Sequence, residues 1–176
     1  MSFTMDKKNI LITGSPGVGK TTLIKRISYE LQHLHPAGFF TEEIRVEGVR
    51  KGFSLVSLDG RRATLSHTGI VSHERVGKYG VDIVAFEDFL DHISFFNQDV
   101  GVIIIDEIGK MECISDRFNK LLIIILKQET PVIATISMKG EGIIKEIRKR
   151  DDVKMFVMTQ SNRYSLLPEI VTLIHT

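Results

Sequence analysis

A glycine-rich stretch near the N-terminus constrains this chain more than any other feature. The run Gly14-Ser-Pro-Gly-Val-Gly-Lys-Thr21 matches the pattern G-x-x-x-x-G-K-[ST] at every fixed position. Glycines let the backbone wrap around a phosphate with its N–H groups pointing inward, and a helix that starts there adds the positive end of its dipole. An apolar segment at 9–13 and an amphipathic one at 20–34 predict the strand and the helix that the motif requires. The sequence therefore predicts a phosphate-binding loop.

Each residue of this loop has an expected role. Lys20 is expected to reach the β- and γ-phosphates, and Thr21 to supply a hydroxyl ligand to Mg²⁺. Thr22 follows the motif and is expected near the α-phosphate. The residues expected to bind the nucleotide are Gly14, Ser15, Pro16, Gly17, Val18, Gly19, Lys20, Thr21 and Thr22.

A second motif follows the apolar run at 100–105. Asp106 and Glu107 come directly after it, which is the Walker-B arrangement. Open α/β sheets bind ligands at the carboxyl ends of their strands, so Asp106 is expected to hold Mg²⁺ through a water. Glu107 would then orient the attacking water. The alternative is that this acidic pair ends the strand and faces solvent.

Further polar residues fit the same edge of the sheet. In the additional-strand class of P-loop NTPases, a strand between the P-loop and Walker-B strands ends in a polar sensor of the γ-phosphate, and Thr135 or Ser137 fits that place after the apolar run at 132–136. Ordinary strand-end residues are the alternative. The charge that develops during phosphoryl transfer calls for another cation, for which Lys110 and Arg163 are candidates. A solvated surface arginine is the alternative for Arg163.

Composition excludes several classes of protein. The 176 residues predict one domain over 1–176. Lys plus Arg is 23 and Asp plus Glu is 22, a net charge of +1, so we expect neither nucleic acid nor a membrane as a partner. The single cysteine, Cys113, excludes an internal disulfide framework and a cysteine-based zinc site.

Location and assembly rest on weaker patterns. The polar start at 1–8 has no signal-peptide core, and the aliphatic run at 121–126 is far shorter than the ~20 residues of a membrane span. We therefore expect a cytoplasmic protein. The run at 121–126 predicts a deeply buried helix segment, with a subunit contact as the alternative. We expect a monomer or a weak homo-oligomer.

The alternation of segments predicts an α/β fold with a mostly parallel sheet flanked by helices. Antiparallel strands are expected around 38–65, and residues 66–80 are expected to form a long polar loop. A strand is expected at 81–84. The helix that follows is expected to bury Phe86, Phe89, Leu90, Ile93 and Phe96.

Three segments carry a family resemblance: Asp106-Glu-Ile-Gly-Lys-Met-Glu112, Gly38-Phe-Phe-Thr-Glu-Glu-Ile-Arg45 and Asn162-Arg163. Together with the phosphate-binding loop, they resemble nucleoside-triphosphatases of the thermophilic nucleoside-triphosphate phosphatase type, also called the cancer-related nucleoside-triphosphatase family. The resemblance implies a RecA-like fold with added antiparallel strands. It implies slow, Mg²⁺-dependent hydrolysis of several nucleoside triphosphates to the diphosphate and phosphate.

The resemblance also implies which positions form the site: Lys20, Thr21, Asp106, Glu107, Lys110, Glu112 and Arg163. Thr41, Glu42 and Glu43 match the family pattern too, and a structural role on the added strands is favoured for them. Two other functions stay open. One is a small-molecule or nucleotide kinase, and the other is a nucleotide-dependent switch or binding module that uses the loop at 66–80.

Overall fold

The computed structural model describes residues 7–175. Residues 1–6 and residue 176 lie outside this range. Residues 1–6 make up most of the polar N-terminal segment at 1–8 that was discussed above. The described elements are β1 (Asn9–Gly14), α1 (Lys20–Glu30), β2 (Ala37–Val46), β3 (Val49–Ser57), β4 (Arg62–His67), β5 (Arg75–Val76), β6 (Tyr79–Val81), α2 (Ile83–Asp91), β7 (Ile103–Ile108), α3 (Asp116–Lys127), β8 (Val132–Ile136), α4 (Ile143–Arg148), β9 (Val153–Met158) and α5 (Leu166–His175). Short 3₁₀ turns lie at Gln32–Leu34 and Glu112–Ile114.

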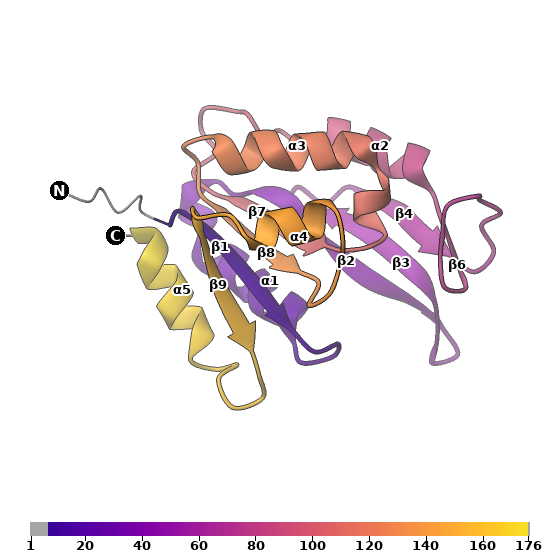
Figure 1. The fold of residues 1–176 in the computed structure, drawn as a ribbon, viewed down its shortest axis with the longest axis horizontal. Coiled ribbons are helices and arrows are strands. Elements are labelled where there is room, and N and C mark those ends of the chain that lie inside the picture. The colour runs from indigo at the N-terminus through magenta and orange to yellow at the C-terminus, as the bar shows by residue number, and fades with distance from the viewer. Residues whose placement is uncertain (1–6, 176) are drawn as a thin grey trace.

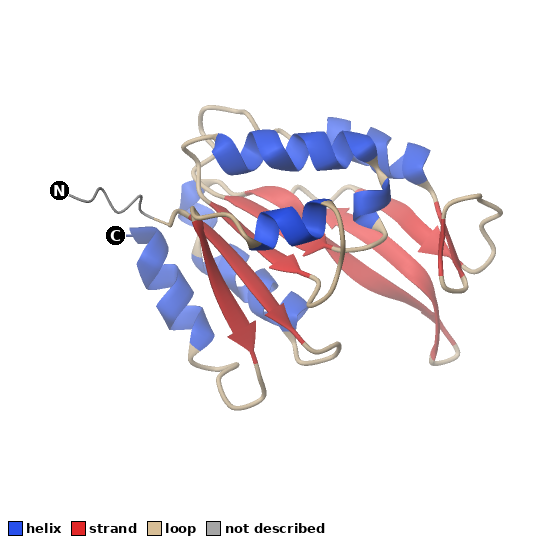
Figure 2. Ribbon diagram, in the orientation of Figure 1, coloured by secondary structure: helices blue, strands red, loops and turns tan. Residues whose placement is uncertain are grey.

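Within the described residues, one nine-stranded sheet runs through the fold in the order β5-β6-β4-β3-β2-β7-β8-β1-β9 (Figures 1 and 2). Strands β2, β7, β8, β1 and β9 pair in parallel. Strand β8 lies between β1, which leads into the phosphate-binding loop, and β7, which carries Asp106. This order is that of the additional-strand class and confirms the predicted α/β fold.

The antiparallel part of the sheet is larger than the sequence predicted. Strands β3, β4, β6 and β5 continue the sheet beyond β2 with antiparallel pairing. The prediction of one long loop over 66–80 is therefore wrong in part, because β5 and β6 form a hairpin inside it and β6 pairs with β4. The strand expected at 81–84 is also wrong beyond Val81. Asp82 accepts a hydrogen bond from the backbone N–H of Ala85 and starts α2 instead.

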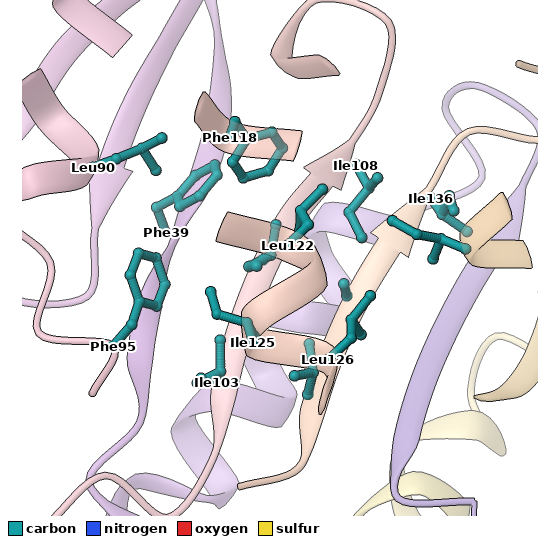
Figure 3. Close-up of a cluster of buried hydrophobic side chains, with 14 of the residues drawn as sticks. Phe39, Leu90, Phe95, Ile103, Ile108, Phe118, Leu122, Ile125, Leu126 and Ile136 are labelled. Atoms are coloured by element: carbon teal, nitrogen blue, oxygen red, sulfur yellow. The ribbon is translucent and has the colours of Figure 1, made fainter. Parts of the chain in front are cut away.

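Two hydrophobic cores lie on opposite faces of the sheet because alternate residues of a buried strand point to opposite sides. On β1, Leu11 belongs to the core with α2, α3 and α4, whereas Ile10 and Ile12 belong to the core with α1 and α5. Figure 3 shows the first core, in which Phe39 of β2 lies between Phe118 of α3 and Phe95. No helix in residues 7–175 combines the length and apolarity that a membrane crossing requires.

Two burial predictions need correction. Phe95 is buried in place of Phe96, which is 57% exposed, because α2 ends at Asp91 and the chain turns before these residues. Within the apolar run at 121–126, Ile124 is 56% exposed, whereas Leu122, Ile125 and Leu126 are buried. Only one side of α3 packs against the sheet, so the run is not buried all round.

Gly38 marks a very close approach between β2 and β7. A Cβ at Gly38 would lie 1.7 Å from the carbonyl oxygen of Ile104, whereas a Cβ at Gly48 would meet nothing within 4 Å. Both glycines have positive φ, 146° and 77°, so alanine is strained at either position.

We expect Gly38→Ala to lower the free energy of unfolding by about 3 kcal/mol, because the new methyl group must push β2 away from β7. Gly48→Ala should cost about 1 kcal/mol, which is the backbone strain alone. Urea unfolding of both variants beside the wild type measures the difference. Equal costs would contradict the close approach of the two strands.

Candidate active site

A cavity of about 750 Å³ opens at the carboxyl ends of the central parallel strands. It extends from the phosphate-binding loop across β8 and β7 to the antiparallel strands. Its lining residues are Gly14, Pro16, Gly17, Gly19, Lys20, Thr21, Thr22, Thr41, Glu42, Glu43, Arg50, Phe53, Val76, Glu107, Lys110, Met111, Glu112, Ser137 and Met138. Most of the residues predicted to form the site thus line one cavity.

The phosphate-binding loop connects β1 to α1. Gly17 and Gly19 adopt φ values of 76° and 109°, which glycine allows without strain, and Gly19 precedes the first residue of α1. The ammonium of Lys20 donates to the carbonyl oxygens of Gly14 and Ser15, at 2.8 and 3.2 Å. Val18 is buried, and neither it nor Ser15 is among the lining residues, so these two predicted contacts rest on their backbone alone.

Asp106 is the most connected polar side chain of the site. It is 1% exposed and accepts hydrogen bonds from the hydroxyls of Thr21 at 2.8 Å and Thr135 at 2.5 Å. The backbone N–H of Thr41 on β2 is a third donor to it. Burial raises the pKa of the Asp106 carboxyl, while these hydrogen bonds and the charge of Lys20 oppose that rise. Asp106 lies within β7, which runs on to Ile108, so the predicted strand end at 105 was too early.

The oxygen atoms around Asp106 fit a hard divalent cation. A buried carboxylate needs a compensating positive charge, and no ion pair to Asp106 is found within residues 7–175. Mg²⁺ is typically held by one or two carboxylates, substrate phosphates and waters rather than by a cage of protein ligands. The described chain accordingly offers Thr21 and Asp106, and no group of three His, Cys, Asp or Glu residues that could hold a metal.

Glu107 and Glu112 bring two carboxyl groups together beside Asp106. A Cβ at Gly109 would lie 2.7 Å from an oxygen of each, so both side chains converge on that glycine. Burial and then the charge of Asp106 raise the pKa of Glu107, while Lys20 and a 3.3 Å hydrogen bond from Ser137 oppose the rise. Burial and then the charge of Glu107 raise the pKa of Glu112 to about 8. Burial therefore favours the protonated form of Glu112 at neutral pH.

The two sensor candidates have different places. Thr135 is fully buried and donates to Asp106, whereas Ser137 lines the cavity and donates to Glu107. Ser137 is thus the candidate that faces the cavity. Arg148 of α4, which the sequence analysis missed, donates to the carbonyl oxygen of Ser137 at 2.9 Å and holds this loop in place.

The two candidate cations are also separated. Lys110 is exposed and lines the cavity. Arg163 is not among the lining residues; its guanidinium lies 4.7 Å from the ring centre of Tyr164 and donates to that hydroxyl at 2.6 Å. The catalytic role of either cation stays a prediction.

The antiparallel strands bring charged residues to the far wall of the cavity, and each carboxylate there is paired. Glu42 contacts Lys25 at 2.6 Å and Arg62 at 3.2 Å, and the hydrogen bond from Lys25 is the main reason that its pKa is lowered. Glu43 contacts Arg45 at 2.6 Å and Arg50 at 3.0 Å, and its pKa is lowered by both. These pairs agree with the structural role favoured for Glu42 and Glu43, although both residues also line the cavity.

Arg50 is one of the lining residues that the sequence analysis missed; the others include Phe53, Val76 and Met138. It belongs to no motif, and it reaches the cavity because β2 and β3 pair across a tight turn at Glu47 and Gly48, both with positive φ. A Glu-Gly dipeptide between two strand-like segments was the available signal.

The raised pKa of Glu112 predicts how stability changes with pH. The folded chain keeps the Glu112 proton up to about pH 8, whereas the unfolded chain loses it near the ordinary value of 4.5. Between these values the folded state binds more protons, so stability falls as pH rises, by up to about 1.4 kcal/mol per unit. Glu112→Gln removes this titration. We expect it to gain stability over the wild type steadily from pH 5 to pH 8 in urea unfolding.

Glu42→Gln is the matched control. Cations lower the pKa of Glu42 in the wild type. The contribution of this carboxylate to folding stability is therefore present above pH 4.5 and is lost as pH falls. This variant should therefore be less stable than the wild type at neutral pH. A Glu112→Gln advantage that does not grow with pH would contradict the buried, protonated Glu112.

Comparisons with known proteins agree with this site. A model of the family described as NTPase matches residues 9–171. The nucleoside-triphosphatase THEP1 of Thermotoga sp. strain RQ2 is 43% identical over 166 residues, 94% of each chain. The cancer-related nucleoside-triphosphatase of Homo sapiens is 40% identical, over 96% of this chain and 97% of the human one. The crystal structure of THEP1 from Aquifex aeolicus matches with a TM-score of 0.83 and 35% identity, over 96% of this chain and 99% of that one. The resemblance read from the motifs is therefore confirmed, and the chain belongs to the NTPase family.

Proposed function

We propose that this protein hydrolyses nucleoside triphosphates to the diphosphate and phosphate, with Mg²⁺ as cofactor and little preference for the base. The observation that carries the proposal is the 2.8 Å hydrogen bond between Thr21 and Asp106. It joins the phosphate-binding loop to the Walker-B strand at the cavity that Lys20 and Glu107 also line. The names of the relatives, which are nucleoside-triphosphatases, support the same reaction.

In this reaction some residues of the site bind the phosphates, and one accepts a proton. The loop backbone and the Lys20 ammonium balance the negative charge of the β- and γ-phosphates. Thr21 and Asp106 would hold Mg²⁺, which supplies further charge neutralisation when bound. Glu107 accepts a proton from the water whose oxygen attacks the γ-phosphorus, and the bond from that phosphorus to the bridging oxygen breaks. Its raised pKa brings its basicity closer to neutral pH, where a general base works best.

Fewer observations support the broad base preference, the cellular location and the oligomeric state. No Asn-Lys-x-Asp motif for guanine occurs in the sequence. A cytoplasmic location fits the substrate class, because nucleoside triphosphates are most abundant there. A monomer or weak homo-oligomer stays our expectation.

Lys20→Ala tests the phosphate-binding loop. We expect phosphate release to fall at least 100-fold, roughly the effect of removing one charge-stabilising donor, and nucleotide binding to weaken. Arg26→Ala is the matched control, because Arg26 is an exposed cation on the same helix and does not line the cavity. Phosphate release and equilibrium nucleotide binding measure the two effects. Full activity in Lys20→Ala would rule out the loop as the phosphate site.

Glu107→Gln tests the general base. The variant should keep binding Mg-nucleotide and lose hydrolysis by a factor on the order of 10² or more. Phosphate release from ATP, GTP, CTP and UTP, with Mg²⁺ and with a chelator, measures this beside the wild type. We expect all four nucleotides to release phosphate, and we expect this release to require Mg²⁺. A near-normal rate in Glu107→Gln would move the base role to another residue, with Glu112 the next candidate.

A further inference from the structure

The cavity extends beyond the residues assigned to hydrolysis. Hydrolysis needs one attacking water, which occupies about 30 Å³ in the liquid, beside the triphosphate. The cavity of about 750 Å³ continues past the Walker-B strand into a part lined by β2, β3 and β5. We call this part the extension lobe and define it by Thr41, Glu42, Glu43, Arg50, Phe53 and Val76. Apart from the backbone N–H of Thr41, which donates to Asp106, none of these residues has a role in the proposed hydrolysis.

The extension lobe lies where a nucleophile must approach. The sheet order runs β1, β8, β7, β2, β3, so the lobe is on the far side of β7 from the phosphate-binding loop. Lys20, Asp106 and Glu107 hold the γ-phosphate end of the nucleotide toward β7, and the nucleoside end points away. Attack on the γ-phosphorus is in line with the breaking bond and comes from the side opposite the β-phosphate. That side is the extension lobe.

The lobe presents an aromatic surface. The Phe53 ring lies 5.6 Å from the Tyr79 ring in an edge-to-face arrangement, and the guanidinium of Arg50 lies 5.3 Å from the Phe53 centroid. Phe53 and Val76 both line the cavity and offer apolar surface to a planar ring. Apolar lining with a few fixed polar groups is typical of small-molecule sites.

The charged groups of the lobe are already paired. Arg50 already binds Glu43 and the hydroxyl of Tyr79. Glu42 and Glu43 each have two cationic partners. A second phosphate would therefore have to displace one of these ion pairs, whereas a hydroxyl group can donate to the carboxylate oxygens and leave the pairs intact.

We propose that the extension lobe binds an uncharged alcohol that carries an aromatic ring, and that this alcohol takes the γ-phosphoryl group in place of water. The hydroxyl oxygen forms the new bond to the γ-phosphorus, and the bond from that phosphorus to the bridging oxygen breaks. The hydroxyl proton passes to Glu107, and the nucleoside diphosphate leaves. This inference rests on the nucleotide site of the proposed function and adds a second substrate to it.

The test follows the γ-phosphoryl group from [γ-³²P]ATP with Mg²⁺. The probes are 3-pyridinemethanol, adenosine and cytidine at millimolar concentration, and cytidine 5′-monophosphate is the charged counterpart of cytidine. We expect label on at least one uncharged alcohol, with a matching fall in released phosphate, and none on the monophosphate. Absence of both label and competition for all three alcohols overturns the proposal. Label on the monophosphate alone overturns the choice of an uncharged acceptor.

Two variants separate the lobe from the hydrolytic site. Phe53→Leu removes the ring face and keeps an apolar side chain, and Val76→Phe fills the lobe. Each should reduce label transfer about tenfold, the equivalent of one lost aromatic contact, and leave phosphate release without probe within about twofold of the wild type. Unchanged transfer in both variants overturns the lobe assignment.

Failure of the proposed function looks different. In that case the wild type releases no phosphate even when no probe is present, and Glu107→Gln makes no difference. Circular dichroism and the probe-free rate check the folding of Phe53→Leu, and Val76→Phe gives an independent reading should Phe53→Leu unfold.

Discussion

The buried carboxylate of Asp106 is the group on which the rest of the site depends. It takes one donor from α1 through Thr21, one from β8 through Thr135 and one from the backbone of β2 through Thr41. A carboxylate removed from water is costly unless such bonds replace its hydration, so all three elements must be in place before Asp106 can be charged. The phosphate-binding loop, the additional strand and the first strand of the extension are thereby held in one fixed relation.

These hydrogen bonds to Asp106 explain why the antiparallel strands beyond β2 are part of the site. Strand β2 pairs in parallel with β7 over Ala37 to Phe39 and in antiparallel fashion with β3 from Phe39 onward. The same strand therefore supplies a donor to Asp106 and, a residue or two later, the carboxylates of the far wall. A ligand that moves β2 at Glu42 or Glu43 also acts on the strand that carries the Thr41 donor. The Thr41 donor to Asp106 and the two carboxylates of the extension lobe therefore share one short stretch of β2.

Much of this could be predicted from local patterns. The phosphate-binding loop is one continuous run of residues, and so is the Asp106-Glu107 pair. Phosphate chemistry requires particular residue types at these positions, so both could be recognised from a single sequence. The β5–β6 hairpin could not be seen, because strands of two and three residues leave no periodicity to detect. The helix after β6 was misplaced because the Asp82 cap outweighs the β-branched residues that follow it. Arg50 was missed because its place depends on cross-strand register, and the proton on Glu112 because two carboxyl groups meet only through folding at Gly109.

The arrangement of charge also favours one place for the triphosphate of a nucleotide. A triphosphate carries several negative charges and is drawn to unpaired cations and to backbone N–H groups, which gather at the phosphate-binding loop around Lys20. The cations of the far wall are already paired with Glu42 and Glu43, so a phosphate would have to displace an ion pair to bind there. In the proposed function the triphosphate therefore lies against the loop, and the proposed transfer requires its γ end to face the lobe. Water is always available there at high concentration, so hydrolysis is the reaction that remains whenever no other hydroxyl occupies the lobe. A single geometry then supports both hydrolysis and transfer, and the occupant of the lobe decides between them.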